Sequence, residues 1–462
     1  MRPAFMIRLI LATLVLLCLA GTGLAEEAVI EYAPQSDGTL CVSRISGSGH
    51  LVIPRMHEGK AVTRIGVGAA RDQHRLTGVT LPEGLAAIDD EAFSGCRALR
   101  QIELPDTLAS IGDRAFARCD GLTGLHLPQS LEWLGVNPFY RTGVMVTSDN
   151  PRFTAFDSLV VDEQTQTLIA RTGADYAAQV TLPRGLRHIG DSAMAYQVCL
   201  QNVDLPDTLV TIGSGAFEGC RALMSLTLPE GLTRVGEAAF AGCRALTSIT
   251  FPQSMQEIGD RAFYRAGMLT TPTLPARLNR IGDAAFKGCD SFVNLTLPGS
   301  VTLVGQEAFA QCGGIVQVQF SGPVGELADF AFRDCGMLQT LRFVAGPTKI
   351  GQGAFMNCRM LTEANLAVGT EQIGENAFSG CTKMYAAVLP EGLTHLLTNA
   401  FADCPALTSV TLPATLQIIG DGALPVQSRL VATVSAGSYA EQWVLSHGIA
   451  TVSAGEFDWL FE

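Results

Sequence analysis

The chain has 462 residues and a formal net charge of −13 at pH 7, and 47% of its residues are hydrophobic while 16% are charged. An acidic chain is repelled by nucleic acid and by anionic membrane surfaces, so we expect neither as a partner. Beyond the N-terminal segment no stretch is long and apolar enough to span a membrane, so no membrane insertion of the mature chain is expected.

The N-terminal segment, residues 1–25, has the order of features that is typical of a secretory signal peptide. Arg2 and Arg8 precede an apolar run over residues 9–20, and small residues follow as far as Ala25. The run is shorter than the roughly 20 apolar residues that a membrane-spanning helix needs. The segment therefore predicts export, to the extracellular medium or to the cell surface.

Most of the remaining chain repeats one pattern at intervals of 23 residues, with a single longer gap after Phe139. The register is clearest at the aromatic position of the pattern I-G-x-x-A-F-x-x-C. The residues at this position are Ala70, Phe93, Phe116, Phe139, Met194, Phe217, Phe240, Phe263, Phe286, Phe309, Phe332, Phe355, Phe378, Phe401 and Leu424. A period of about 20–29 residues with a Leu-x-x-Leu-x-Leu core is the signature of a leucine-rich-repeat solenoid, here with about fifteen units.

The expected fold is an α/β repeat, a right-handed leucine-rich-repeat solenoid with one parallel β-sheet face and short helices or turns on the other side. In the unit at residues 223–245, Leu226 points inward from a short strand and Thr227 points outward. Pro229 ends the strand, and Gly236 is expected to permit a tight bend. One unit alone cannot offset the conformational entropy lost on ordering it, so neighbouring units must stack.

The repeats occupy residues 63–142 and 179–427, and atypical segments flank them. Residues 26–62 are interpreted as an N-terminal cap and residues 428–462 as a C-terminal cap, because the ends of a solenoid core must be covered. The C-terminal cap has apolar residues at helical spacing around Trp443. We expect Trp443 to plug the end of the solenoid, and stacking on a ligand is the alternative.

An island at residues 143–178 separates the two runs of repeats. Residues 158–162 and 166–170 are predicted strands joined by a short turn, so the island is expected to be an inserted β-hairpin. Its role is either structural or, because inserted loops often carry binding residues, contact with a ligand.

The units at residues 99–119, 200–220 and 407–420 follow the form LxxIxLPxxLxxIGxxAFxxC. This form closely resembles the BspA-like (Treponema pallidum-type) leucine-rich-repeat proteins, and the likeness covers essentially the whole mature chain. The resemblance implies a secreted or surface-displayed microbial protein that acts in adhesion to host proteins or to other microbes. It implies no particular ligand.

Ten cysteines share one repeat position, three residues after the aromatic register. They are Cys96, Cys119, Cys220, Cys243, Cys289, Cys312, Cys335, Cys358, Cys381 and Cys404. Equivalent residues on successive coils lie about 4.8 Å apart with parallel side chains, whereas a disulfide needs converging Cβ atoms about 3.5–4.5 Å apart. We therefore predict a ladder of buried thiols. Cys41 and Cys199 lie off this ladder and are the candidates for a separate bond.

No catalytic, cofactor-binding or metal-binding pattern is found in the sequence. The seven histidines are scattered without HExxH spacing, and neither a nucleophile elbow nor a phosphate-binding loop occurs. Carboxylates such as Glu230 recur after proline, where they are typical of turns. We therefore expect a non-enzymatic protein without a cofactor.

Binding is expected to use the outward side chains of the repeat strands, as a continuous, concave parallel sheet that is polar and low in charge. For any single Thr or Ser the alternative is a solvent-facing strand residue without a ligand. The candidate residues are Gln101, Glu103, His126, Asn202, Asp204, Ser225, Thr227, Ser248, Thr250, Thr271, Thr273, Asn294, Thr296, Gln317, Gln319, Thr340, Arg342, Glu363 and Asn365.

The predicted function is adhesion or another interaction with an extracellular protein of a host or microbial surface. One alternative is a structural spacer or surface-layer component without a specific ligand. A second alternative is a glycan-binding module, which the near absence of aromatic residues in the outward rows disfavours.

Overall fold

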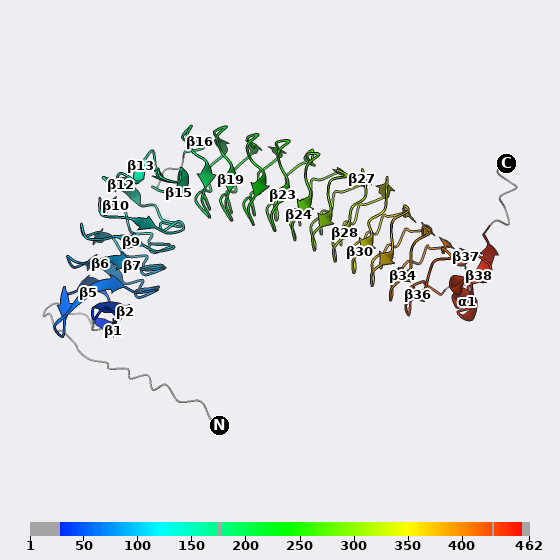
Figure 1. The fold of residues 1–462 in the computed structure, drawn as a ribbon, viewed down its shortest axis with the longest axis horizontal. Coiled ribbons are helices and arrows are strands. Elements are labelled where there is room, and N and C mark those ends of the chain that lie inside the picture. Colours follow the sequence, from blue (N-terminus) through cyan, green and yellow to red (C-terminus); the bar gives the residue numbers. More distant parts are fainter. Residues whose placement is uncertain (1–27, 174–176, 427–428, 455–462) are drawn as a thin grey trace, which may run out of the picture. The chain divides into compact units, whose positions relative to one another are not determined.

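The computed structural model describes residues 28–173, 177–426 and 429–454 (Figure 1). The predicted signal peptide lies outside these described residues. The chain divides into two compact units, residues 1–175 with 190–193 and residues 176–189 with 194–462. Both units consist of the coils of a β-solenoid, about 18 turns in all, so the predicted solenoid is confirmed with a few more turns than the register counts.

Each coil contributes to three rows of hydrogen bonds between coils. In the coil at residues 223–245 the first row is β20 (Ser225–Thr227), the strand predicted from the repeat, and we call this row the strand face. The second is the two-residue strand β21 (Arg234–Val235), whose row we call the long sheet. The third, over residues 238–242, is the turn row.

The first unit begins with an antiparallel pair of strands that leads into parallel coils. One sheet contains β1 (Val29–Pro34), β2 (Leu40–Ser46), β5 (Lys60–Ile65), β7 (Ala87–Ile88), β9 (Ser110–Ile111) and β11 (Trp133–Leu134), with β4 (Met56–His57) paired to β5. The strand face contains β3 (Gly49–Val52), β6 (Leu76–Thr80) and β8 (Gln101–Glu103), and separately β10 (Gly124–Leu127) with β12 (Met145–Ser148).

The predicted hairpin is present in the first unit as β14 (Leu159–Asp162) and β15 (Thr167–Arg171), which pair antiparallel. A third strand that the sequence did not indicate, β13 (Phe153–Phe156), pairs with β14. At the turn, Asp162 binds Arg152 through a 2.9 Å ion pair, and it also accepts a hydrogen bond from the backbone of Gln164. The side chain of Asp162 is buried, so this pair fixes the fold of the island.

In the second unit the long sheet is unbroken. Its strands are β17 (His188–Ile189), β19 (Thr211–Ile212), β21, β23 (Glu257–Ile258), β24 (Arg280–Ile281), β26 (Leu303–Val304), β28 (Glu326–Leu327), β30 (Lys349–Ile350), β32 (Gln372–Ile373), β34 (His395–Leu396) and β36 (Ile418–Ile419). Each pairs in parallel with the next, and the Ile, Val or Leu of each strand is buried. The other residue of each strand faces outward.

The strand face of the second unit is divided into short sheets. These are β16 (Gln179–Thr181) with β18 (Asn202–Asp204); β20 with β22 (Ser248–Thr250); β25 (Asn294–Leu297), β27 (Gln317–Phe320) and β29 (Thr340–Phe343); and β31 (Glu363–Asn365), β33 (Ala386–Val388), β35 (Ser409–Thr411), β37 (Val431–Val434) and β38 (Ala450–Ser453). The continuous sheet predicted for these strands is therefore interrupted.

The strand face lies on the outer side of the curved second unit, and the long sheet lies on its inner side. Figure 1 shows β16 and β27 along the outer edge and β28 and β36 along the inner edge. The hydrogen bonds agree with this curvature, because the coils of a curved stack are closest on the inner side, where pairing is unbroken. The predicted concave position of the strand face is wrong.

The turn row contains turns rather than helices, and its backbone alternates between right-handed and left-handed conformations. Ala238 and Gly242 have φ values of 51° and 71°, and the equivalent residues of the neighbouring coils are also positive. This alternation directs the N–H groups of Ala238, Phe240 and Gly242 to carbonyls of the next coil, each at 2.8 Å. Coils such as that at residues 223–245 are thus bonded to the next along this row as well.

Gly236 does not provide the tight bend expected from the sequence, because its φ is not in the left-handed region. A Cβ atom there would lie 2.6 Å from the carbonyl carbon of Gly213 on the preceding coil. Gly259, one coil further, is equally crowded, with 2.7 Å to the carbonyl oxygen of Val235. The glycine of the I-G pattern thus suits the close approach of neighbouring coils, and the three coils with Asp89, Ala328 or Leu397 at this position must adjust locally.

The core of the second unit is a continuous stack of phenylalanine rings. From Phe217 to Phe401 successive rings are 5.1–5.4 Å apart between centroids and 4–12° from parallel. All of these rings are fully buried. Burial of one such side chain contributes about 1.5–3 kcal/mol, and only stacking on the next coil completes it.

The C-terminal end is covered by α1 (Tyr439–Ser446), the helix that the sequence predicts. Its N-cap is Ser438, whose side chain accepts a hydrogen bond from the backbone N–H of Glu441. The helix buries Ala440 and Val444. Trp443 was expected to plug the solenoid, but it is only half-buried and stacks on His447, with 3.9 Å between ring centroids. The small side chains of Ala440 and Val444, rather than Trp443, cover the C-terminal end of the solenoid core, because α1 packs closely against the last coils.

Candidate functional site

The strand face presents two outward side chains per coil, as the alternation of the repeat predicts. In β20, β22 and β25 the middle residue is buried while its two neighbours are exposed. Strand partners set the register, so that Ser225 lies beside Ser248 and Thr227 lies beside Thr250. Parallel strands about 4.8 Å apart therefore align hydroxyl groups in two rows.

Most of these outward polar groups have no partner within the part of the chain that the structure describes. Their side chains form no hydrogen bond or ion pair with other described residues, and they are exposed or half-buried. These residues are Gln101, Glu103, Asn202, Ser225, Thr227, Ser248, Thr250, Asn294, Thr296, Gln317, Gln319, Thr340 and Arg342. They can therefore offer hydrogen bonds to an external partner without breaking internal ones.

Two candidates, Thr271 and Thr273, do not lie on a strand. Between them is Pro272, which is buried at the position held by Ile249 in β22. Proline has no backbone N–H to donate, so pairing stops between β22 and β25. The hydroxyl of Thr271 instead accepts a hydrogen bond from the backbone of Val293, at 2.8 Å. Their assignment to a sheet is therefore corrected.

Four candidates are held by neighbouring side chains. Asp204 accepts hydrogen bonds from Gln179 at 3.2 Å and Thr181 at 2.9 Å. In the first unit His126 lies 3.0 Å from the hydroxyl of Thr147 and 3.4 Å from a carboxylate oxygen of Asp149.

Glu363 and Asn365 form the second held group, on β31. The amide of Asn365 donates to Glu363 at 2.7 Å, and the phenol of Tyr385 on the next coil also donates to Glu363. The hydrogen bond to this carboxylate raises the pKa of the Tyr385 phenol. Tyr385 is 47% exposed, so it is an aromatic group on the strand face that the outward rows of the sequence did not include.

Other apolar groups on this face were also missed. Val388 lies on β33 beside Asn365 and is 45% exposed, and Val344 and Val368, which follow β29 and β31, are 71% and 74% exposed. The repeat gave no signal for either valine, since Val344 replaces the strand-ending proline and Val368 follows Ala367, which replaces it in its own coil. Tyrosine is frequent at the energetic centres of protein interfaces, and apolar area is concentrated in their buried cores.

The predicted thiol ladder is confirmed, and it provides no reactive site. All ten ladder cysteines are buried and reduced. Each thiol donates to the backbone carbonyl 26 residues earlier, with Sγ···O distances of 3.0–3.4 Å. Burial raises the pKa of Cys96 and Cys312 to about 12. Cys41 and Cys199, the two off the ladder, are half-buried free thiols without a disulfide.

Two further features of the site follow from the described residues. Among them no group of three or more His, Cys, Asp or Glu side chains could hold a metal ion. None of the helices over residues 28–173, 177–426 and 429–454 is long and apolar enough to cross a membrane.

Comparison with known families identifies the repeat. The family model described as BspA type leucine rich repeat region matches residues 59–152, 175–289, 256–384 and 303–431, which together make up most of the chain. The chain belongs to the BspA-type leucine-rich repeat family. The resemblance expected from the pattern LxxIxLPxxLxxIGxxAFxxC is therefore confirmed.

Solved structures that are similar to this chain include other leucine-rich repeat proteins. A leucine-rich repeat protein from Bacteroides ovatus is 26% identical, with a TM-score of 0.55, and the match covers 84% of this chain and 94% of that protein. A leucine-rich repeat protein from Eubacterium ventriosum (20%, TM-score 0.46) is matched over 63% of this chain and 93% of its own. A leucine rich cell surface protein from Faecalibacterium prausnitzii (21%, TM-score 0.39) is matched over 94% and 99%. The comparison with curated proteins gave no match.

Proposed function

We propose that this BspA-type chain is an exported, non-enzymatic binding protein that recognises a protein partner through its strand face. The observation that carries the proposal is the array of unpartnered hydroxyl and amide side chains on the aligned strands β20, β22, β25 and β27. Rows of such groups on neighbouring coils can form several hydrogen bonds to one partner. Export is supported by the signal peptide that residues 1–25 predict.

The long sheet is a weaker candidate for this role. It presents one outward residue per coil, and several of these already bind one another. Arg280 and Glu257 form an ion pair at 2.7 Å, and Lys349 and Glu326 form another at 2.8 Å. A partner would have to compete with these pairs, whereas the strand face has polar groups that no other described side chain occupies.

Protein recognition is also supported by the composition of the strand face towards the C-terminal end of the second unit. Arg342, Tyr385 and Val388 lie within three successive coils there. Arg and Tyr contribute most of the affinity in many protein interfaces, and the hydroxyl rows can surround such a centre. A spacer without a ligand would need neither the exposed tyrosine nor the exposed valines.

Binding to a panel of extracellular matrix proteins and microbial cells tests the proposal. The purified protein is compared with a variant that carries Thr227→Lys, Thr250→Lys and Thr296→Lys, all exposed strand-face positions. We expect saturable binding by the parent protein and loss of binding in the variant, because three bulky charges interrupt the hydroxyl rows.

A matched control carries the same charge change on the long sheet, as Thr211→Lys, Gln372→Lys and Ile418→Lys. It should bind like the parent. Loss of binding in this control alone would place the site on the inner sheet and contradict the proposal. Absence of binding across the whole panel would support the spacer interpretation instead.

A further inference from the structure

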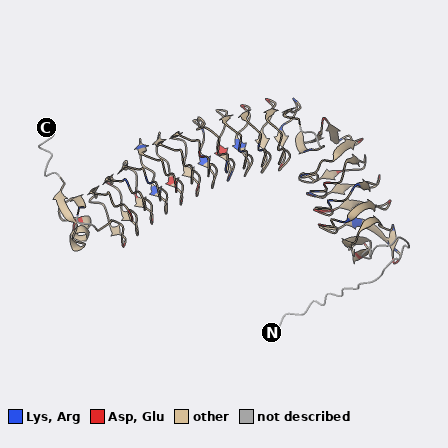
Figure 2. Ribbon diagram, turned by 180° about the vertical axis from the view of Figure 1, so that it is seen from behind, with Lys and Arg blue, Asp and Glu red and all other residues tan. Residues whose placement is uncertain are grey.

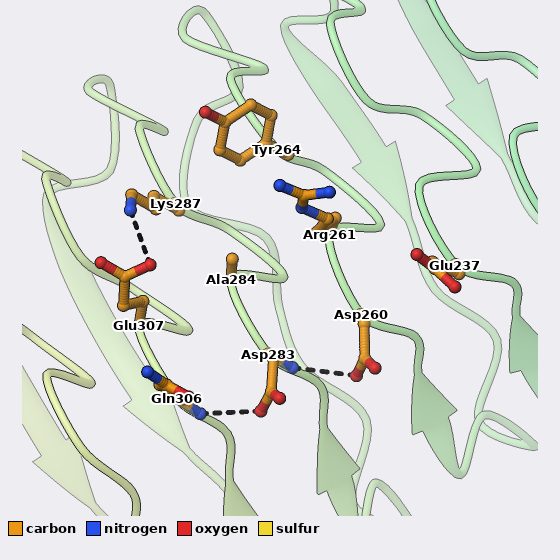
Figure 3. A pocket seen from close by; sticks show the side chains of 9 residues that line it. All are labelled: Glu237, Asp260, Arg261, Tyr264, Asp283, Ala284, Lys287, Gln306 and Glu307. Atoms are coloured by element: carbon orange, nitrogen blue, oxygen red, sulfur yellow. Dashed lines mark hydrogen bonds and ion pairs between the residues drawn. The ribbon is translucent and has the colours of Figure 1, made fainter.

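A hollow of about 330 Å³ opens on the turn row of the second unit, away from the strand face (Figure 3). Ala284 lies at its floor, and Arg261 and Glu307 occupy the same repeat position on the coils before and after. The hollow exists because one small side chain lies between two long ones. Tyr264 and Lys287 form the wall on one side.

Carboxylates line the opposite side, and the backbone fixes two of them. Asp260 accepts a hydrogen bond from the backbone N–H of Asp283 at 2.9 Å. Asp283 in turn accepts one from the backbone N–H of Gln306 at 2.8 Å (Figure 3). Each bond uses Oδ1, so Asp283 keeps Oδ2 available to a ligand. The carboxylates are therefore rigid acceptors at the edge of the hollow.

Half of the six charged side chains in the lining are balanced by an ion pair. Lys287 binds Glu307 at 2.7 Å, and Asp260 binds Arg280 at 3.0 Å. Within the described part of the chain Arg261 has no ion pair, and its guanidinium lies 5.6 Å from the ring centroid of Tyr264. Glu237 and Asp283 have no ion pair with other described residues, so the hollow has donors from Arg261, acceptors from Asp283 and a net uncompensated charge of about −1.

We propose that this hollow binds one unit of a neutral saccharide. A polyhydroxylated ring both donates and accepts hydrogen bonds, so its hydroxyls match the available oxygen of Asp283 and the N–H groups of Arg261. An anion would meet four carboxylates in the lining, and an apolar ligand would desolvate them. The volume is at the lower end of the range of ligand pockets, which suits a single sugar ring.

The site is independent of the protein-binding role of the strand face. It lies in a different row of hydrogen bonds, and none of its lining residues belongs to the strand face. A saccharide site here would let the protein hold a glycan and a protein partner at the same time.

Saturation-transfer NMR with galactose, N-acetylglucosamine and lactose tests the proposal on the purified protein. Ala284→Arg should fill the hollow and abolish the signal, and the backbone tolerates it, because Arg261 has the same positive φ at the equivalent position. The matched control is Asn376→Arg, at the same repeat position but outside the hollow, which should bind like the parent.

A second pair of variants tests the carboxylate. Asp283→Asn preserves an oxygen for the backbone bond and replaces the other oxygen with a donor, so we expect about ten-fold weaker saccharide binding. Asp329→Asn changes the equivalent bond to Gln352 outside the hollow and should have no effect. Unchanged thermal unfolding in all four variants confirms that they fold.

Charged analogues decide the ligand class. Glucosamine carries a protonated amine and N-acetylneuraminic acid a carboxylate, and both should bind more weakly than N-acetylglucosamine. Preference for either charged sugar would overturn the assignment to neutral saccharides. Absence of any signal from the neutral sugars, or equal binding by Ala284→Arg and Asn376→Arg, would overturn the site itself.

Discussion

The thiol of Cys243 donates a hydrogen bond to the backbone carbonyl of Phe217 on the preceding coil, with Sγ···O at 3.2 Å. The same carbonyl accepts the backbone N–H of Cys220, also at 3.2 Å. The cysteine thus satisfies a second lone pair of a buried oxygen while filling a small space. This explains why one repeat position is cysteine in a chain that makes no disulfide from these residues.

Between Cys220 and Cys404 the ladder has one gap, at Ala266, between Cys243 and Cys289. Ala266→Cys should place a thiol near the carbonyl of Phe240, as its neighbours do, and raise the free energy of unfolding by about 0.5–1 kcal/mol. Cys289→Ala should lower it by a similar amount, since it removes the bond to Phe263. Thermal unfolding of both variants measures the difference. A lower midpoint for Ala266→Cys would show that the site has no room for sulfur.

The ladder thiols should not react in the folded protein. They are fully buried, and burial raises the pKa of Cys119 as well as those of its neighbours, so the reactive thiolate is not formed near neutral pH. With a thiol reagent at pH 8, we expect Cys41 and Cys199 to react first and the ladder only after unfolding. Mass spectrometry of the labelled peptides identifies the sites. Fast labelling of Cys312 in the native protein would contradict the buried ladder.

Stability should fall at alkaline pH because of the same thiols. Their pKa in the unfolded chain is close to 9.0, whereas burial raises the pKa to about 12 for Cys312 and to about 11 for Cys404. Only the unfolded state therefore loses protons between these values. The contribution of each thiol to the free energy of unfolding is complete below pH 9. It is lost as pH rises from about 9 to 12, and each thiol then lowers the free energy of unfolding by about 1.4 kcal/mol for every pH unit.

Unfolding midpoints in denaturant between pH 8 and pH 10.5 measure this slope. The matched variant carries Cys312→Ala and Cys335→Ala, which removes two titrating groups from the middle of the ladder. Its stability should fall less steeply with pH than that of the parent. Parallel slopes for the two proteins would assign the alkaline loss to other groups.

The repeat could be predicted from the sequence because every coil carries the same buried pattern. The 23-residue spacing of residues such as Phe240 and Cys243 determines which side chains stack, and the inward and outward alternation around Leu226 determines the first strand. The long sheet was not predicted, since strands of two residues such as Arg234–Val235 have no periodicity of their own. The curvature also depends on which of the two rows of strands stays continuously hydrogen-bonded from coil to coil. The sequence of a single repeat does not show this.

The candidate site was predicted only in part. Thr227 and Thr250 could be placed on the strand face because they alternate with buried residues. The effect of Pro272 on pairing was not anticipated, although the residue is visible in the sequence. The hollow above Ala284 could not be found in the same way, because it arises from the lengths of side chains on three coils.

Close approach of the coils leads to a last prediction, on glycine. In Gly259→Ala the new Cβ would lie 2.7 Å from the carbonyl oxygen of Val235, so the adjacent coil must shift, and we expect a loss of about 2 kcal/mol or more. In Gly267→Ala the nearest atom is 3.8 Å away and φ is not positive, so the change should be neutral or slightly stabilising. Asp89, Ala328 and Leu397 occupy the position of Gly259 in three other coils, so the stack can adjust and the variant should still fold. Thermal unfolding of the two variants compares the same chemical change with and without a backbone clash, and equal midpoints would refute close approach as the reason for this glycine.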